Sequence, residues 1–297
     1  MAPRMHDDEI DHDLGLVRRL LEAQRPEWAG MPIEPVVSTG TDNAMYRLGD
    51  EMVVRLPLKP RVVTSADKED RWLSVLAPQL PLPIPVPLYR GVATEIYPWP
   101  WSVQPWFDGY DATTADLDLH VAAGDLASFI SALQAIDAQG GPKPGRANFG
   151  RGVPLAERDD LTRGSIEAAH DLVDVEAVTA AWEEALRVPV WDRPPVWVHG
   201  DLAAGNLVVR DGRLSAVIDW GGLGIGDPAV DLIVAWELFD GESREILRSV
   251  LGVDDATWAR GRGWALSTAI VALPYYQHTN AFMAAQARHK LAVVLNQ

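Results

Sequence analysis

The hydrophobic pattern of the first part of the chain predicts a helix followed by three short strands. Leu16, Leu20 and Leu21 recur at helical spacing between charged residues, so residues 14–28 are predicted to form an amphipathic helix that ends near Pro26. Short runs rich in Val, Met, Tyr and Leu follow, and Gly and Asp separate them. They predict three antiparallel strands, at residues 35–37, 45–48 and 52–56.

A second group of apolar positions predicts one more helix and two more strands. Trp72, Leu73 and Leu76 share one face of residues 66–76, which are predicted to be helical. The proline-dense stretch 78–87 cannot form a regular helix. Further strands are predicted at residues 88–92 and 101–107. Five strands and one packed helix therefore predict a small lobe.

The remainder of the chain has helical periodicity. Amphipathic stretches predict helices at residues 115–136, 167–186, 229–239, 243–251, 257–273 and about 276–295. A glycine-containing loop is predicted at residues 140–152. The pattern therefore predicts an α+β fold of two lobes. A small antiparallel-sheet lobe with an N-terminal helix covers residues 1–105, and a larger helical lobe covers residues 106–297.

The charge of the chain narrows the range of partners. Lys and Arg number 26 against 42 Asp and Glu, which gives a formal net charge of −16, and no long basic stretch offsets it. Nucleic acid and anionic membranes are therefore not expected as partners. The same charge favours a cationic organic substrate through electrostatic steering, although an acidic composition also serves solubility alone.

The absence of cysteine excludes disulfides, thiolate nucleophiles and cysteine-based zinc sites. The acidic residues 1–13 contain no apolar core of the length that a signal peptide needs, and no stretch approaches the length of a membrane span. We therefore expect a cytoplasmic protein.

A short segment carries His, Asp and Asn at the spacing of a kinase catalytic loop. His199-Gly200-Asp201-Leu202 follows an apolar strand, and Asn206 stands five residues after Asp201. In such a loop the Asp accepts the proton of the attacking hydroxyl and the Asn binds a metal ion. The spacing predicts Asp201 as a catalytic base and Asn206 as a metal ligand.

Asp219-Trp220-Gly221 stands at the place of the kinase metal-binding triplet, after a predicted hairpin. Phosphoryl transfer requires these residue types because charge spreads over the phosphoryl oxygens while a metal ion bridges them to the enzyme. A lone Asp after a strand is more often a turn or cap residue. The joint occurrence of Asp201, Asn206 and Asp219 favours a kinase that uses Mg²⁺ with ATP or GTP.

These segments resemble the aminoglycoside phosphotransferase family, whose loop reads His-Gly-Asp-Leu followed by Asn, and the resemblance covers most of the chain. It implies a protein-kinase-like bilobal fold, a Mg²⁺-nucleotide bound between the lobes, and transfer of the γ-phosphoryl group to a small-molecule hydroxyl. It implies the base role for Asp201 and the metal roles for Asn206 and Asp219. Asp231 is expected to brace the catalytic loop.

The resemblance also indicates where the nucleotide would bind. Arg55 stands where protein kinases carry a Lys over the phosphates, and Arg donates to phosphate bidentately. Glu69 is placed to pair with Arg55; a solvated helix charge is the alternative. Gln104 and Trp106 are expected in the hinge that meets the base, with an ordinary buried strand as the alternative. A reduced glycine loop would cover the phosphates; its predicted contacts are Gly40, Thr41 and Asn43.

Other polar residues receive structural or open interpretations. His199 is expected to hold the geometry of its loop rather than to act as an acid, base or metal ligand. Several acidic residues are candidates for binding an amine of the substrate, each with a solvated surface or a helix cap as the alternative. They are Glu157, Asp159, Asp160, Glu237 and Asp240.

The sequence thus predicts a small-molecule kinase that acts on a hydroxyl of an aminoglycoside-like or other antibiotic. A metabolic kinase for choline, a sugar or an amino-alcohol is the alternative among enzymes, and a non-catalytic nucleotide-binding module is the alternative from another class. A protein kinase is disfavoured because Ala203 stands where that catalytic loop usually carries Lys, and no Ala-Pro-Glu segment is visible after Asp219.

Overall fold

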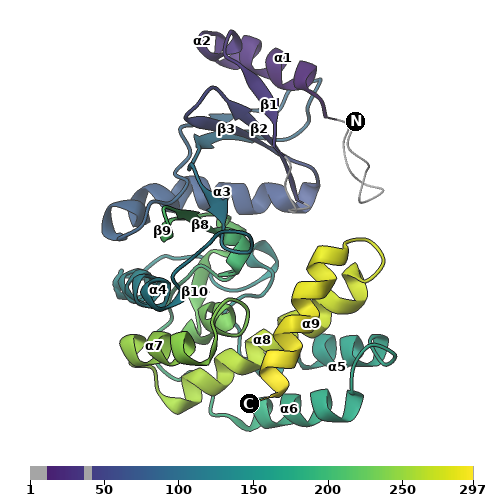
Figure 1. The fold of residues 1–297 in the computed structure, drawn as a ribbon. Helices are drawn as coiled ribbons and strands as arrows, with labels where there is room; N and C mark the ends of the chain where they lie inside the picture. Colours follow the sequence, from purple (N-terminus) through teal and green to yellow (C-terminus); the bar gives the residue numbers. More distant parts are fainter. Residues whose placement is uncertain (1–11, 37–41, 297) are drawn as a thin grey trace.

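The computed structural model describes residues 12–36 and 42–296, and Figure 1 shows their arrangement. The predicted phosphate contacts Gly40 and Thr41 lie outside the described residues. Within them, no helix combines the length and the apolarity that crossing a membrane requires.

The N-terminal part is built on a five-stranded antiparallel sheet with strand order β1-β2-β3-β5-β4. The strands are β1 (Ile33–Pro35), β2 (Asn43–Leu48), β3 (Met52–Pro57), β4 (Tyr89–Gly91) and β5 (Trp101–Pro105). Burial alternates along β2, where Ala44, Tyr46 and Leu48 face the core. All five predicted strands are present, with ends displaced by a few residues.

Two short helices cover one side of this sheet. Helix α1 (Leu14–Gln24) packs Leu16, Val17, Leu20 and Leu21 into the same apolar cluster as the inward residues of β2 and β3. The prediction of one helix to residue 28 is wrong, because Arg25 is not helical (φ −145°, ψ 65°) and α2 (Pro26–Ala29) begins after it. Pro26 lacks the N–H that a continuous helix needs and disfavours helical geometry at Arg25.

Helix α3 (Pro60–Leu76) lies between the sheet and the larger part of the molecule (Figure 1). It starts earlier than predicted, with Pro60 in the first turn, where a missing N–H is tolerated. Its C-terminal half faces away from the sheet: Leu73 and Leu76 belong to the larger apolar cluster, and the ring of Trp72 lies 4.9 Å from that of Trp197. The helix therefore packs on both parts of the molecule.

The C-terminal part is mainly helical. Its α-helices are α4 (Leu119–Ala135), α5 (Asp159–Ala168), α6 (Val175–Arg187), α7 (Gly241–Leu251), α8 (Asp255–Tyr276) and α9 (Ala281–Leu295). Its strands form two small antiparallel sheets, β6-β8-β9 and β7-β10. They are β6 (Tyr110–Asp111), β7 (Val196–Val198), β8 (Leu207–Arg210), β9 (Arg213–Val217) and β10 (Gly224–Gly226). The division at residues 105–106 remains a prediction.

Two helix predictions in this part are wrong. A single helix was predicted over residues 167–186, but α5 ends at Ala168 and α6 begins at Val175. Asp174 caps α6, and its side chain accepts the N–H of Ala177 at 3.0 Å. The stretch predicted as a helix at residues 229–239 is instead the 3-10 helix η6 (Pro228–Trp236), which has tighter turns.

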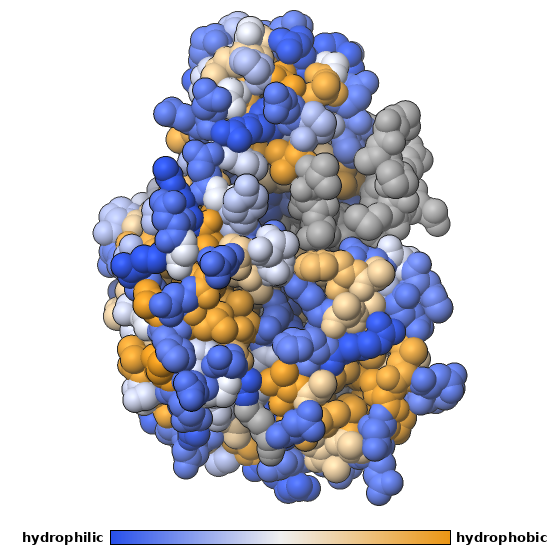
Figure 2. All heavy atoms as spheres, viewed as in Figure 1, coloured by the Kyte–Doolittle hydropathy of each residue, from blue (hydrophilic) through white to orange (hydrophobic). Residues whose placement is uncertain are grey.

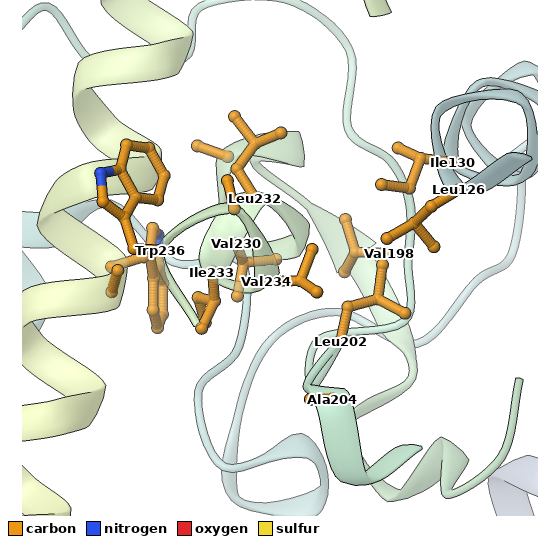
Figure 3. Packing of buried hydrophobic residues seen from close by; sticks show 14 of the residues in the cluster. Leu126, Ile130, Val198, Leu202, Ala204, Val230, Leu232, Ile233, Val234 and Trp236 are labelled. Carbon is orange, nitrogen blue, oxygen red and sulfur yellow. The ribbon is translucent and has the colours of Figure 1, made fainter. Parts of the chain in front are cut away.

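Helix η6 is buried along its whole length and packs against the segment that contains His199 and Gly200. Figure 3 shows Val230 and Val234 in one packed group with Val198, Leu202 and residues of α4. Asp227 caps η6 by accepting the N–H of Ala229 at 3.0 Å. Because η6 has almost no exposed surface, its position is fixed by packing from all sides.

Arg260 of α8 anchors the start of η6 through a buried ion pair. Its Nε and Nη2 donate to the two carboxylate oxygens of Asp227 at 2.7 and 3.2 Å, and both side chains are 4% exposed. We expect Arg260→Ala to lower the free energy of unfolding by about 3–5 kcal/mol, since the partner charge would be left buried and unpaired. Urea denaturation followed by tryptophan fluorescence measures this.

The matched control is Arg193→Ala, which removes an arginine from an exposed pair with Asp254 at 3.2 Å. Exposed pairs contribute about 0–1 kcal/mol, so the control should unfold close to wild type. Equal losses in the two variants would contradict the role given to the buried pair.

Candidate active site

The HGD loop, residues 199–206, follows β7, and one carboxylate accepts hydrogen bonds from its backbone. Asp231 of η6 accepts the backbone N–H of His199 at 2.8 Å and that of Gly200 at 2.7 Å. Burial raises the pKa of Asp231 to about 7, although these two hydrogen bonds favour its charged form. The bracing expected of Asp231 is therefore confirmed by its contacts.

His199 is fully buried and points into the loop rather than toward solvent. Its Nδ1 accepts the backbone N–H of Asp201 at 3.2 Å, so its Nε2 carries the proton and donates to the carbonyl oxygen of Ile218 at 3.1 Å. Burial lowers the pKa of His199, which keeps the ring neutral. These contacts support a structural role for His199.

The DWG turn, residues 219–222, follows the hairpin of β8 and β9 and touches the HGD loop directly. Gly200 has φ +82°, and a Cβ there would lie 2.3 Å from the carbonyl oxygen of Gly222. A Cβ on Gly222 would lie 2.8 Å from the carbonyl oxygen of His199. Glycine at both positions is therefore required for the close approach of the two backbones.

The carboxylates of Asp201 and Asp219 are both accessible, with side chains 45% and 53% exposed. Asn206 lies at the end of a 3-10 turn, and its Nδ2 donates to the carbonyl oxygen of Asp201 at 2.9 Å. The Ile218 N–H donates to the Asn206 carbonyl oxygen at 2.9 Å, which links the segment leading to Asp219 with Asn206. The structure therefore brings the three motif residues together.

Amide and carboxylate oxygens are the ligands that Mg²⁺ prefers, so the donor chemistry of Asn206 and Asp219 fits this ion. The amide nitrogen of Asn206 is occupied by the Asp201 carbonyl oxygen, which leaves the amide oxygen as the donor atom for a metal. The described residues contain no group of three or more His, Cys, Asp or Glu arranged to hold a metal ion. Phosphate and water oxygens would have to complete the ligand sphere.

Arg55 of β3 joins the sheet to this centre. Its Nη1 donates to Oε2 of Glu69 on α3, and its Nη2 lies 3.6 Å from Oδ1 of Asp219. The amide of Asn43 is oriented with its oxygen toward Arg55, and this oxygen accepts hydrogen bonds from Nη2 and Nε of Arg55 at 3.1 and 3.2 Å. Burial opposes the charge of Arg55, but Glu69 and Asp219 outweigh it and raise its pKa. The structure therefore brings these four predicted residues together.

Lys68, a residue that the sequence did not single out, precedes Glu69 on α3 and reaches the DWG turn. Its Nζ donates to the carbonyl oxygens of Gly221 at 3.0 Å and Leu223 at 2.9 Å. Burial lowers its pKa from 10.5 to about 8. Two consecutive residues of α3 thus reach two sites: Glu69 contacts Arg55 of the sheet, and Lys68 contacts the DWG turn.

The two predicted hinge residues have different surroundings. Gln104 of β5 is 5% exposed and lines a small depression together with Asn43, Arg55 and Glu69. Trp106 lies apart from this group. Its ring packs under the guanidinium of Arg47, its Nε1 donates to Asp108 at 3.0 Å, and its backbone N–H donates to Glu51 at 2.7 Å.

Arg151 contacts the predicted base and was missed by sequence reasoning. Its Nη2 donates to Oδ1 of Asp201 at 2.9 Å. It comes from the loop between α4 and α5, which the sequence identified only as a connection. No spacing rule links residue 151 to the HGD loop, because the contact depends on how the helical part folds back.

The acidic candidates for substrate amines have structural partners. Asp159 accepts from Trp182 at 2.8 Å and pairs with Arg163, and Asp240 caps α7. Glu237 accepts the N–H of Ala204 at 2.8 Å and pairs with Lys290 at 2.5 Å. Glu157 and Asp160 are exposed. For Asp159, Asp240 and Glu237 the structural alternative accounts for the observed contacts.

The HGD loop and the DWG turn lie where the N-terminal sheet meets the helical part. This arrangement is typical of a kinase-like phosphotransferase. The chain belongs to the phosphotransferase enzyme family (APH), which residues 35–264 match. The family resemblance and the bilobal α+β fold expected from the sequence are thereby confirmed.

Similar proteins include aminoglycoside and macrolide phosphotransferases. The GDP complex of a point mutant of aminoglycoside 2′-phosphotransferase IIIa has a TM-score of 0.76 at 18% identity and covers 94% of this chain and 96% of its own. Macrolide 2′-phosphotransferase from Brachybacterium faecium has a TM-score of 0.63 at 23% identity, over 96% and 98%. An aminoglycoside 3′-phosphotransferase of Escherichia coli is 37% identical over 105 residues, which are 31% of this chain and 38% of that enzyme.

The lowered pKa of Lys68 predicts a pH-dependent contribution to stability. Between pH 8 and 10.5 the unfolded chain holds more protons on this residue than the folded one, so the free energy of unfolding rises with pH. The variant Lys68→Met lacks this titrating group, so its free energy of unfolding should not show this rise with pH. From about pH 7.5 to about pH 9.5 we expect wild type to gain up to about 2 kcal/mol relative to the variant in urea denaturation.

The control is Lys143→Met, since Lys143 is exposed. Its stability difference from wild type should not change over the same pH range. A constant difference for Lys68→Met as well would contradict a depressed pKa for Lys68.

Proposed function

We propose that this protein transfers the γ-phosphoryl group of Mg-ATP or Mg-GTP to a hydroxyl group of a small molecule. The observation that carries the proposal is the junction at which Arg55, Glu69 and Asp219 meet beside the accessible carboxylate of Asp201. This reaction requires a cation for the phosphates, a carboxylate for the metal and a second, accessible carboxylate for the hydroxyl proton. A non-catalytic binding module has no need of the second carboxylate.

In this proposal the nucleotide lies between the residue 1–105 lobe and the residue 106–297 lobe. Arg55, oriented by Glu69 and Asn43, donates to the phosphates, and Gly40 and Thr41 supply further donors. Gln104 and Trp106 lie at the hinge where the base would bind. Asn206 and Asp219 would hold Mg²⁺, which would supply positive charge to the phosphoryl oxygens.

Asp201 acts on the acceptor. Its carboxylate accepts the proton of the acceptor hydroxyl while the oxygen of that hydroxyl bonds to the γ-phosphorus and the bond to the β-phosphate oxygen breaks. Arg151 holds Oδ1 of Asp201 at 2.9 Å, so Oδ2 is the oxygen left to face the hydroxyl. Arg151 is therefore a positioning residue for the base.

The acceptor in this proposal is an antibiotic or another hydroxyl compound. Similar proteins are aminoglycoside and macrolide phosphotransferases by name, which supports an antibiotic acceptor. A metabolic kinase for choline, a sugar or an amino-alcohol would use the same residues and is the alternative. A panel of these compounds with Mg-ATP and Mg-GTP, read by mass detection of an added phosphate, distinguishes them.

Replacing Asp201 and replacing Asp219 should impair different steps of the reaction. We expect Asp201→Ala to lower turnover roughly a hundredfold or more, with Mg-ATP affinity close to wild type, because proton transfer contributes about 10²–10⁴. Asp219→Ala should instead abolish the Mg²⁺ dependence of nucleotide binding, because a direct metal ligand is lost. Nucleotide titrations with and without Mg²⁺, together with single-turnover rates, separate the two. Loss of nucleotide binding in Asp201→Ala would contradict its role.

Arg151→Ala should lower kcat on the order of tenfold or more and leave the KM for Mg-ATP unchanged, because the carboxylate of Asp201 loses the partner that orients it. Arg151→Lys should recover part of the loss, since a cation at this place still pairs with Asp201. The control is Arg146→Ala, because Arg146 is an exposed arginine of the same loop. An unchanged kcat in Arg151→Ala would remove it from the mechanism.

A further inference from the structure

The HGD loop is bound at both of its ends by carboxylates from η6 and the residue after it. Asp231 accepts the backbone N–H groups of His199 and Gly200, where the loop begins. Glu237, directly after η6, accepts the N–H of Ala204 with Oε1 at 2.8 Å, where the loop turns toward β8. The two carboxylates therefore hold different parts of the same loop.

The N–H of Ala204 lies at the start of the 3-10 turn η4 (Ala204–Asn206). The first N–H groups of a helical turn have no partner within that turn. Ala203, which precedes the turn in an extended conformation, has no side-chain oxygen that could accept one. Glu237 supplies this acceptor from a distant part of the chain, and the turn that it stabilises ends at Asn206.

The position of Glu237 is fixed by residues of two helices. Arg244 of α7, 6% exposed, donates to the carbonyl oxygens of Ala235 and Phe239 at 2.8 and 2.9 Å. These two carbonyl groups flank Glu237 in the chain. Lys290 of α9 binds the second carboxylate oxygen, Oε2, at 2.5 Å. Both the backbone around Glu237 and its two carboxylate oxygens are therefore held.

Lys290 lies on the inner face of α9. Ala287, Leu291 and Val294 recur at helical spacing on this face and are buried in the larger apolar cluster. Figure 2 shows hydrophilic residues spread over most of the visible surface, whereas the side chains of Glu237 and Lys290 are only 6% and 11% exposed. Burying a carboxylate is costly unless a partner charge offsets the cost, and Lys290 supplies that charge.

We propose that Glu237 is a positioning residue for Asn206, because it holds the turn on which this candidate metal ligand lies. Lys290 of α9 provides the counterion that the buried carboxylate needs. The inference rests on the proposed function, in which Asn206 would bind Mg²⁺. Replacing a group that orients a metal ligand typically costs about 10–100-fold in metal affinity. The C-terminal helix thereby contributes to the Mg²⁺ affinity of the site without contacting the ion.

Two double variants of the full chain separate the hydrogen bond from the ion pair, since both replace the pair by uncharged residues. Glu237→Gln with Lys290→Met, the Gln/Met variant, keeps an amide oxygen that accepts the N–H of Ala204. Glu237→Leu with Lys290→Met, the Leu/Met variant, has no acceptor at this place. Replacing a buried ion pair by uncharged residues of similar volume is often tolerated, so both variants should fold.

ATP binding is titrated by calorimetry, with EDTA and at a series of Mg²⁺ concentrations. For half-maximal binding we expect the Leu/Met variant to need roughly tenfold more Mg²⁺ than wild type, and the Gln/Met variant to stay within about twofold. ATP affinity with EDTA should be equal in all three proteins, because a general loss of structure would lower it as well. Without metal or nucleotide, hydrogen exchange of the peptide that contains Ala204 should be faster in the Leu/Met variant alone.

A proline at residue 204 tests the same hydrogen bond from its donor side. Ala204→Pro, added to the Leu/Met variant, removes the N–H that has lost its acceptor. Ala203 has φ −134° and ψ 158°, the extended geometry that a residue before proline prefers. This triple variant should recover most of the lost Mg²⁺ affinity. If the Leu/Met variant does not fold, the triple variant decides: a wild-type Mg²⁺ requirement supports the positioning role, and failure to fold overturns it.

An equal Mg²⁺ requirement in the Gln/Met and Leu/Met variants would overturn the positioning role and leave the proposed function intact. The role would also be overturned by a loss of ATP affinity in the Leu/Met variant that is as large with EDTA as with Mg²⁺, or by a triple variant as impaired as the Leu/Met variant. ATP binding by wild type that does not respond to Mg²⁺ would overturn the proposed function together with the positioning role.

Discussion

The candidate site depends on a contact between two stretches of backbone that one buried carboxylate stabilises. Gly200 and Gly222 let the HGD loop and the DWG turn approach without side chains between them. Asp231 then accepts two consecutive N–H groups of the HGD loop, at 2.8 and 2.7 Å. The burial of this carboxylate is costly and raises its pKa, and the two hydrogen bonds offset part of that cost. The backbone thereby positions Asp201 and Asp219, whose side chains remain 45% and 53% exposed beside Arg151 and Arg55.

Helix α3 connects the DWG turn to the N-terminal sheet. Adjacent residues of an α-helix point about 100° apart, so Glu69 and Lys68 reach different neighbours from one turn. Glu69 contacts Arg55 of β3, and Lys68 contacts the carbonyl oxygens of Gly221 and Leu223. A rotation of α3 would alter both contacts together. Arg55 and the DWG turn are therefore coupled through one rigid element, helix α3.

The sequence predicted those features that local spacing determines. The five strands of the N-terminal sheet, most helices and the positions of Asp201, Asn206 and Asp219 follow from periodicity and motif spacing, whereas β6 and β10 were not predicted. The structure brings Arg55, Glu69 and the motif residues together. Arg151, Lys68 and the pair of Glu237 with Lys290 could not be predicted, because each contact joins residues far apart in the chain. The break between α5 and α6 was missed for a different reason: the capping by Asp174 overrides an unbroken amphipathic pattern.

Net charge is a property of the whole molecule and does not by itself define a binding site. The value of −16 suggested an amine-rich ligand, but steering acts on approach, whereas selectivity depends on the groups that the ligand meets once water is displaced. Asp159 and Asp240 already bind a tryptophan, an arginine or a helix N-terminus, and Glu237 binds a backbone N–H and a lysine. Selectivity for an acceptor depends on the side chains that it contacts, so the net charge alone does not select among acceptor classes.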